Sequence, residues 1–272
     1  MPAPPQLTAA MYERIRALVH TEVGIELGPA KQSLVESRLG KRLRELGLTS
    51  YEAYLERLDA DRDANAESDE LVLLLDAIST NVTSFFRERA GLDEIAARHA
   101  RAVASGQRRL RYWSAASSSG QEAYSLAMLL AEATPTTGLD LAILGTDIST
   151  RVLAMARRGR YPLAQLDSVP TTLHRHLRRD GELFEISPAL RAQCVFNRLN
   201  LIKPPFPMKG PFDAVLCRNV MIYFDQPTRV QLIGEIHRLL KPGGLLVTGQ
   251  AESLTGRIGG FRTVKPSMYE RI

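Results

Sequence analysis

Over the first 80 residues or so, apolar side chains recur at the three- to four-residue spacing of amphipathic helices. The pattern predicts four helices: Thr8–Val23, about Ala30 to Leu46, Ser50–Leu58 and Ser68–Ile78. They are separated by Gly24, by Gly47 and by the polar run 59–67. No alternating pattern typical of a strand interrupts them, so we expect a small all-helical domain over residues 1–80.

From Arg108 onward, short apolar runs alternate with segments of helical periodicity. The predicted strands are 110–115, 141–147, 195–201, 212–217 and 245–250, and the helices between them are Glu122–Glu132, Thr150–Arg158 and Thr228–Leu240. Such alternation predicts an α/β fold with a mostly parallel, doubly wound sheet that has helices on both faces. We assign this domain to residues 81–272. Its last two apolar segments, after Gly260, are expected to form a terminal hairpin with an antiparallel strand.

One stretch of the second domain departs from this alternation. The segment LHRHLRRDGELFEIS, residues 173–187, is polar and basic and contains no core-strand pattern. We interpret residues 163–195 as an inserted subdomain that forms a small β element around Asp180 and Gly181.

Composition limits the class of protein but does not choose its function. The chain is 44% hydrophobic, and no stretch reaches the roughly 18 apolar residues that a membrane span requires. Only two cysteines occur and no export signal is evident, so we expect a cytoplasmic protein with neither a disulfide framework nor a cysteine-rich zinc site. The net charge of +5 favours an acidic partner, which could be nucleic acid, an anionic membrane surface or an acidic protein face.

The second predicted helix combines an apolar face with a basic one. Four basic side chains cluster beside its apolar face at helical spacing and are called the basic stripe below: Lys31, Arg38, Lys41 and Arg42. Two interpretations remain open. The stripe is either a solvated surface or a docking face for an acidic helix.

Ligands of open α/β sheets bind beyond the carboxyl ends of the strands, so the residues that follow each strand are the candidates for a site. The turn after the first strand, Trp113–Tyr124, is rich in small residues but lacks the G-x-G-x-x-G of dinucleotide enzymes. Asp147 ends the second strand, where it could accept hydrogen bonds from a ribose or cap the next helix. Arg218, Asn219 and Tyr223 follow the fourth strand, at the same edge.

Six motifs in this order identify a family. They are residues 80–88 (TNVTSFFRE), the turn 113–124, residues 145–149 (GTDIS), Asn200-Leu201, residues 217–224 (CRNVMIYF) and residues 240–244 (LKPGG). With them the chain resembles, over nearly its whole length, the CheR-type chemoreceptor glutamate methyltransferases of bacterial chemotaxis.

The resemblance implies transfer of a methyl group from S-adenosylmethionine to glutamate side chains on the cytoplasmic helical bundle of a chemoreceptor. The products are a glutamate methyl ester and S-adenosylhomocysteine. Carried over by position, the residues implied to line the cofactor site are Asn81, Thr83, Arg87, Glu122, Asp147, Asn200, Leu201, Arg218 and Asn219. Arg87 and Tyr223 are implied to lie near the transferred methyl, and the basic stripe to contact the receptor.

The family often has two acids in the turn where this chain has Gln121-Glu122. We keep the ribose role for Glu122, but Asp147 is a second acid near the adenosine, and the choice between the two stays open. A glutamate substrate titrates near pH 4.3, so at neutral pH it attacks as a carboxylate and needs no general base. The five histidines show no spacing typical of metal ligands, so we expect no metal.

Two other classes of function are disfavoured. A base-amino methyltransferase of nucleic acid would carry an N/D-P-P-aromatic run after the fourth strand, where this chain reads Cys217-Arg218-Asn219. A non-catalytic binding module of the same fold is disfavoured because the implied cofactor residues are retained. The loop 178–183 of the insertion is short, so we expect receptor recognition without a tether to a receptor C-terminal peptide. We expect a monomer that inserts into no membrane.

Overall fold

The computed structural model describes residues 5–64, 69–78, 82–134, 138–254 and 259–272. The chain divides into two compact units. The helical unit comprises Met1–Thr80 and Tyr223–Asp225, and the sheet unit comprises Asn81–Ile222 and Gln226–Ile272.

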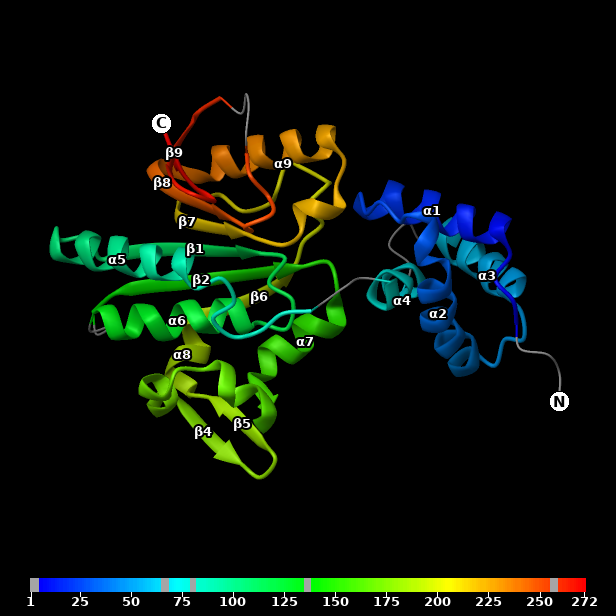
Figure 1. Cartoon of the computed structure of the whole chain (residues 1–272), viewed down its shortest axis with the longest axis horizontal. Helices are drawn as coiled ribbons and strands as arrows, with labels where there is room; N and C mark the ends of the chain where they lie inside the picture. Colours follow the sequence, from blue (N-terminus) through cyan, green and yellow to red (C-terminus); the bar gives the residue numbers. More distant parts are fainter. Residues whose placement is uncertain (1–4, 65–68, 79–81, 135–137, 255–258) are drawn as a thin grey trace. The chain divides into compact units, whose positions relative to one another are not determined.

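The described part of the helical unit consists of helices joined by short turns (Figure 1): α1 (Ala9–Val23), the 3-10 turn η1 (Pro29–Lys31), α2 (Gln32–Leu46), α3 (Tyr51–Ala64) and α4 (Asp69–Ile78). Thr8 caps α1 by accepting a hydrogen bond from the Met11 N–H (3.3 Å), and Gly24 ends it with φ +68°. Ser68, the predicted first residue of the fourth helix, lies outside the described residues.

Helix α3 is longer than its apolar pattern predicts. It continues past Leu58 to Ala64, through part of the polar run that we interpreted as a separator. The extension is rich in alanine and charged residues, and Asp59 within it forms an ion pair with Arg14 of α1. Polar residues can continue a helix whose last turns are exposed to solvent. A prediction based only on the period of apolar residues therefore ends this helix too early.

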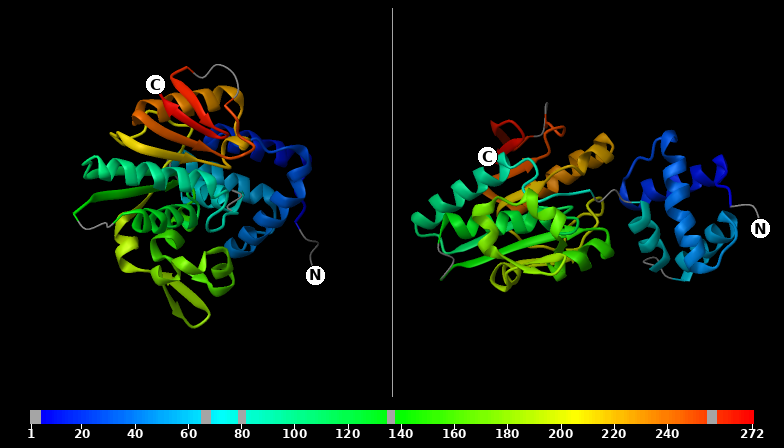
Figure 2. Two further views of the ribbon diagram at one scale, coloured as in Figure 1. Left: turned by 60° about the vertical axis from the view of Figure 1, so that its left-hand side comes forward. Right: turned by 60° about the horizontal axis from the view of Figure 1, so that its bottom comes forward.

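The sheet unit contains a seven-stranded sheet in the order β6-β2-β1-β7-β8-β10-β9. Its strands are β1 (Arg109–Ala115), β2 (Asp140–Asp147), β6 (Cys194–Arg198), β7 (Phe212–Cys217), β8 (Leu240–Thr248), β9 (Phe261–Lys265) and β10 (Met268–Arg271). The first five are parallel, and β10 is antiparallel to both β8 and β9. Figure 2 shows β9 and β10, coloured red, at the edge beside β8. The predicted doubly wound, mostly parallel fold with a terminal hairpin is confirmed.

Helices cover both faces of this sheet: α5 (Ala90–Ala104), α6 (Gln121–Ala133), α7 (Thr150–Arg158), the short α8 (Pro188–Gln193) and α9 (Gln226–Leu239). Strand side chains alternate between the faces. Tyr112 enters the core that β1 shares with α5 and α6, whereas Trp113 packs against Phe206 on the other face (ring centroids 5.8 Å apart). The Phe206 N–H in turn donates to Glu235 of α9.

The segment between α7 and β6 forms a second, three-stranded sheet in the order β3-β5-β4. Its elements are β3 (Arg160–Pro162), the 3-10 turns η2 (Leu163–Ser168) and η3 (Thr171–His176), β4 (Leu177–Asp180) and β5 (Leu183–Ile186). The β4–β5 hairpin turns at Gly181, where φ is +59°. Tyr161 and Phe184 are buried beside Phe85, so this sheet is packed onto the unit rather than projecting freely. Among the described residues, no helix is long and apolar enough to cross a membrane.

Candidate functional site

The turn between β1 and α6 is built for close backbone approach. Ala116, Ser118 and Gly120 all have positive φ, at +58°, +49° and +92°. A Cβ on Gly120 would lie 2.9 Å from the Cβ of Ala156 in α7, so this position excludes every side chain. The small residues noted in the sequence therefore form a tight turn at the carboxyl end of β1, the edge of the sheet where ligands of this fold bind.

Asp147, at the carboxyl end of β2, has its carboxylate immobilised by two backbone amides. The Ser118 N–H donates to Oδ2 (2.9 Å) and the Ser149 N–H donates to Oδ1 (3.0 Å). Ser149, and not Asp147, caps α7 by accepting from the Val152 N–H. The cap of α7, one of the two roles left open for Asp147, is thus made by Ser149. Asp147 itself is a buried carboxylate that is held in place at the ligand-binding edge of the sheet.

Glu122 and Arg218 come from different motifs and meet at this edge. Glu122, in the first turn of α6, accepts from the Ser114 hydroxyl (2.7 Å) and from Nη1 of Arg218 (2.9 Å). The Arg218 side chain is only 2% exposed. Its Nη2 donates to the backbone carbonyl of Arg87 and, at 3.3 Å, to Glu88. One guanidinium therefore joins the end of β7 to the first turn of α6 and to the segment before α5.

Asn219, the next residue, has φ +58°, in the left-handed region that asparagine tolerates. Its side-chain amide donates to Glu88 (3.1 Å), and its backbone N–H donates to Glu252 (2.7 Å). The structure thus brings Arg218 and Asn219 together with two carboxylates, Glu88 and Glu252, to which the sequence motifs gave no role. The position of Glu252 shortly after β8 was the only sequence signal that could have drawn attention to it.

The other residues implied to line the cofactor site make local contacts or lie outside the described residues. Arg87 is exposed, and its guanidinium donates to the Val82 carbonyl (3.1 Å). Asn200 stabilises the turn after β6 by accepting from the Ile202 N–H (3.2 Å). Thr83 is half-buried, Leu201 is buried, and Asn81 lies outside the described residues. Their roles toward the cofactor stay predictions.

Tyr223 ends the 3-10 turn η4 (Met221–Tyr223) and is grouped with the helical unit. The Lys31 ammonium lies 5.5 Å from the centroid of its ring, and its carbonyl accepts from the Glu26 N–H (3.0 Å). The proposed action of Tyr223 near the methyl group stays a prediction.

Two members of the basic stripe have internal partners. Arg38 donates to the carbonyls of Ala77 and Ile78 at the end of α4 (3.3 and 2.7 Å). Arg42 makes a two-pronged contact with buried Glu70 (3.1 and 2.7 Å). The Lys41 side chain, in contrast, is 77% exposed, 4.0 Å from Glu45. The stripe therefore combines structural cations with an exposed one, and its docking role stays a prediction.

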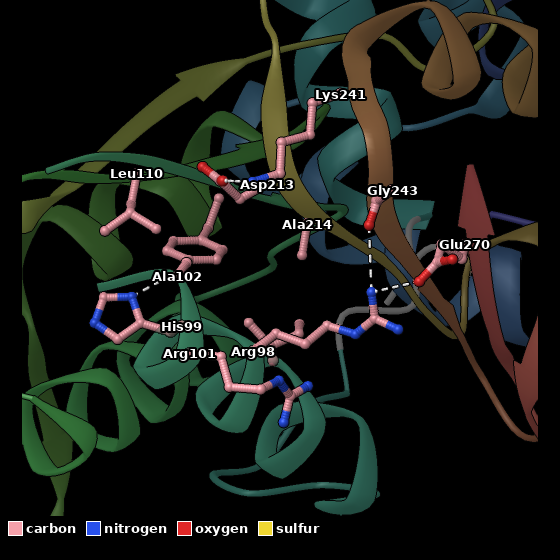
Figure 3. Close-up of a pocket in the computed structure, with 12 residues that line it drawn as sticks. Arg98, His99, Arg101, Ala102, Leu110, Asp213, Ala214, Lys241, Gly243 and Glu270 are labelled. Atoms are coloured by element: carbon pink, nitrogen blue, oxygen red, sulfur yellow. Dashed lines mark hydrogen bonds and ion pairs between the residues drawn. The ribbon is translucent and has the colours of Figure 1, made fainter. Parts of the chain in front are cut away.

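A pocket of about 320 Å³ lies at the opposite, amino-terminal edge of the sheet, between α5 and the starts of β1, β7 and β8 (Figure 3). Arg98 donates to Glu270 (2.9 Å) and to the Gly243 carbonyl (3.2 Å), and Lys241 pairs with Asp213 (2.5 Å). Burial lowers the pKa of His99 on its wall. These charged side chains are already paired with one another, so we assign them a structural role. We therefore place the candidate site at the carboxyl edge of the sheet.

Two protein-family models match the chain. The one described as "CheR methyltransferase, SAM binding domain" matches residues 81–269, and "CheR methyltransferase, all-alpha domain" matches residues 10–79. The chain belongs to the CheR methyltransferase family. Its cofactor is S-adenosylmethionine, and the sheet unit contains the domain that binds it.

Curated relatives extend over almost the whole chain. The chemotaxis protein methyltransferase of Salmonella typhimurium is 38% identical over 269 residues, which cover 97% of this chain and 90% of the relative. That of Escherichia coli is 39% identical, covering 92% of this chain and 86% of the relative. Chemotaxis protein methyltransferase 2 of Pseudomonas aeruginosa is 37% identical, covering 95% and 91%. The resemblance inferred from the six motifs is confirmed.

The carboxyl edge suits the cofactor of CheR methyltransferases. Four carboxylates, Glu88, Glu122, Asp147 and Glu252, lie along it together with the buried guanidinium of Arg218. Such an acidic site disfavours a phosphate-bearing dinucleotide and favours a cation such as a sulfonium. Within the described residues, Arg218 Nε and Ser117 Oγ are buried without a hydrogen-bond partner. Orphaned buried polar atoms are costly, so a polar ligand at this edge would stabilise them.

Proposed function

We propose that this methyltransferase esterifies glutamate side chains on the cytoplasmic helical bundle of chemoreceptors. Family membership and the curated chemotaxis relatives support the substrate class. The observation that carries the proposal is the acidic edge organised by Arg218, where the end of β7, the first turn of α6 and the segment before α5 meet. The product is a glutamate methyl ester, which is neutral, whereas the unmodified glutamate carries a negative charge. This loss of charge would adjust receptor output.

The reaction requires no general base from the protein. When bound, S-adenosylmethionine supplies an electrophilic methyl group on a sulfonium sulfur. The substrate glutamate is ionised at neutral pH, so no residue has to remove a proton. The protein's task is to bind, to orient the carboxylate and to exclude water. We propose that Arg87 and Tyr223 orient it, since both side chains donate hydrogen bonds to carboxylates. The described residues contain no cluster of potential metal ligands.

We propose that the cofactor is held by the residues implied by the family resemblance at this edge. Glu122 and Asp147 are the two carboxylates that could accept hydrogen bonds from its ribose. Glu122 already receives the Ser114 hydroxyl and Arg218, whereas Asp147 receives two backbone amides. Both are immobilised, and immobilised acceptors bind hydroxyls with little further loss of entropy.

Calorimetric titration with S-adenosylhomocysteine tests the cofactor site. Wild-type protein should bind in the micromolar range, and Asp147→Ala should bind at least about 10-fold more weakly, because one buried charge-assisted contact is worth roughly 1.5–3 kcal/mol. Arg87→Ala should also bind more weakly. Since Arg218 contacts the backbone carbonyl of Arg87, this variant removes the guanidinium and leaves that contact in place. Glu182→Ala, an exposed position in the insertion, is the control.

A folded wild-type protein that binds no S-adenosylhomocysteine would contradict the enzyme assignment and favour the non-catalytic module. Given binding, incubation with a receptor cytoplasmic fragment and methyl-labelled cofactor identifies the substrate class. Methyl esters release the label as methanol in mild base, whereas methyl groups on nucleic-acid bases do not. Base-labile incorporation into the receptor is the expected result, and stable incorporation into nucleic acid would favour the rival class.

Receptor recognition is proposed to occur through the basic stripe and without a C-terminal tether. Lys41 is the informative position, because its side chain is exposed and its substitution leaves the Arg38 and Arg42 contacts intact. Lys41→Glu should raise KM for the receptor fragment several-fold, with S-adenosylhomocysteine affinity and Tm unchanged, and Lys209→Glu on the sheet unit should have no effect. Receptor fragments with and without the tail should be methylated equally. Tight binding of a tail peptide would contradict this view.

A further inference from the structure

Glu252 is a buried carboxylate whose described partners are backbone N–H groups. It lies just after β8 and is 6% exposed. Its Oε2 accepts from the N–H of Asn219 (2.7 Å) and of Gly249 (2.8 Å), and its Oε1 accepts from the N–H of Ile222 (3.2 Å). One side chain thereby joins the turns that follow two neighbouring parallel strands, β7 and β8.

Glu88, in the segment before α5, contacts two side chains of the turn after β7 and one backbone N–H of the turn after β8. Its Oε1 accepts from Nδ2 of Asn219 (3.1 Å), and its Oε2 accepts from Nη2 of Arg218 and from the Gln250 N–H (3.3 and 3.2 Å). Burial acts to raise the pKa of Glu88, but the charge of Arg218 and the hydrogen bonds from Asn219, Arg218 and the Gln250 N–H together lower it. Glu88 is thus a carboxylate that holds two side chains of the turn.

The backbone of this region needs such support. Asn219 has φ +58° and Glu88 has φ +48°, and left-handed conformations at non-glycine residues persist where the surroundings enforce them. There is also no spare room. A Cβ on Gly249 would lie 2.6 Å from Oε2 of Glu252 and 2.9 Å from Nδ2 of Asn219.

We propose that Glu252 and Glu88 are positioning residues of the cofactor site. Glu252 fixes the backbone of the Arg218–Asn219 turn, and Glu88 fixes the side chains of Arg218 and Asn219. Neither has to touch the transferred methyl. The inference rests on the proposed function, because it gives Arg218 and Asn219 their role toward the cofactor.

Glutamine substitutions test it. Glu252→Gln keeps the volume of the side chain but replaces one acceptor oxygen by an NH2 group, which cannot accept from an N–H. Both oxygens are used, so either orientation of the amide loses at least one contact. The dissociation constant for S-adenosylhomocysteine should rise about 10-fold or more in Glu252→Gln and in Glu88→Gln. KM for S-adenosylmethionine should rise in parallel, and kcat should change less, because ground-state binding is what the turn supports.

Glu235→Gln is the matched control. Glu235 is 9% exposed and accepts from the Phe206 N–H (2.6 Å) and from the Arg238 guanidinium, and neither partner is a candidate residue. This variant should lower Tm without changing the dissociation constant. A merely structural role for Glu252 and Glu88 would give that same pattern, whereas a positioning role changes binding in protein that is fully folded.

The outcomes separate the two proposals. If the wild type binds S-adenosylhomocysteine and both glutamine variants bind it equally well, the positioning role is wrong and the proposed function stands. If Glu235→Gln weakens binding as much as they do, the role is also wrong. Should Glu252→Gln fail to fold, Glu88→Gln decides alone, because the Glu88 side chain is 19% exposed and contacts mostly side chains. A wild type that does not bind contradicts the proposed function itself.

Discussion

Arg218→Lys is expected to weaken S-adenosylhomocysteine binding by roughly 100-fold. The guanidinium donates hydrogen bonds to Glu122, to Glu88 and to the Arg87 carbonyl at the same time. A lysine ammonium is a point charge on a differently shaped side chain and cannot span all three. Loss of about two charge-assisted contacts, at roughly 1.5 kcal/mol each, corresponds to that factor. Calorimetry measures it directly.

The control for this prediction is Arg98→Lys. Arg98 similarly joins two carboxylates, Glu94 and Glu270, and a carbonyl, that of Gly243, but at the opposite edge of the sheet. Its substitution should lower Tm and leave cofactor affinity unchanged. If Arg218→Lys bound S-adenosylhomocysteine as tightly as the wild type, the buried guanidinium would not organise the site.

Arg42→Ala is expected to destabilise the helical unit by about 3 kcal/mol. The variant leaves Glu70, whose side chain is 4% exposed, as a buried carboxylate without its cation, and breaking such a pair costs about 3–5 kcal/mol. We take the lower end because the Arg42 side chain is 18% exposed. Chemical unfolding followed by far-ultraviolet circular dichroism, to which the helices of both units contribute, measures the change.

Lys41→Ala, one residue away, should change stability by less than about 0.5 kcal/mol because its side chain is exposed. In the double variant Arg42→Met with Glu70→Leu, both charges are gone and most of the loss should be recovered. Equal stability of Arg42→Ala and the wild type would show that Glu70 finds other compensation. The result also matters for docking, since loss of methylation in Arg42→Ala would report instability rather than receptor contact.

Most of the fold follows from the period of apolar residues. The strands before Asp147 and Cys217 and the helix Thr150–Arg158 end where their patterns end. Helix α5 was not predicted, although it lies between the motif 80–88 and the first strand. Its buried residues, including Leu92, Ile95 and His99, do recur at helical spacing.

The sequence predicts which residues belong to the site but not the contacts between them. Sequence placed Glu122 at the start of a helix and Arg218 directly after a strand, but their contact spans 96 positions of the chain, and nothing local encodes it. Glu252 was missed for a related reason. Its partners are backbone amides of turns, which have no side-chain signature. The left-handed backbone of Asn219 likewise arises from packing around it.

The opposite charges of the two proposed binding surfaces bear on turnover. The carboxyl edge of the sheet is acidic, whereas Lys41, the exposed cation of the basic stripe, is positive. Methyl transfer converts the sulfonium of the cofactor into a neutral thioether and the carboxylate of the receptor into a neutral ester. Each surface therefore loses its electrostatic attraction for its own product, which favours product release and the next encounter with an unmodified receptor.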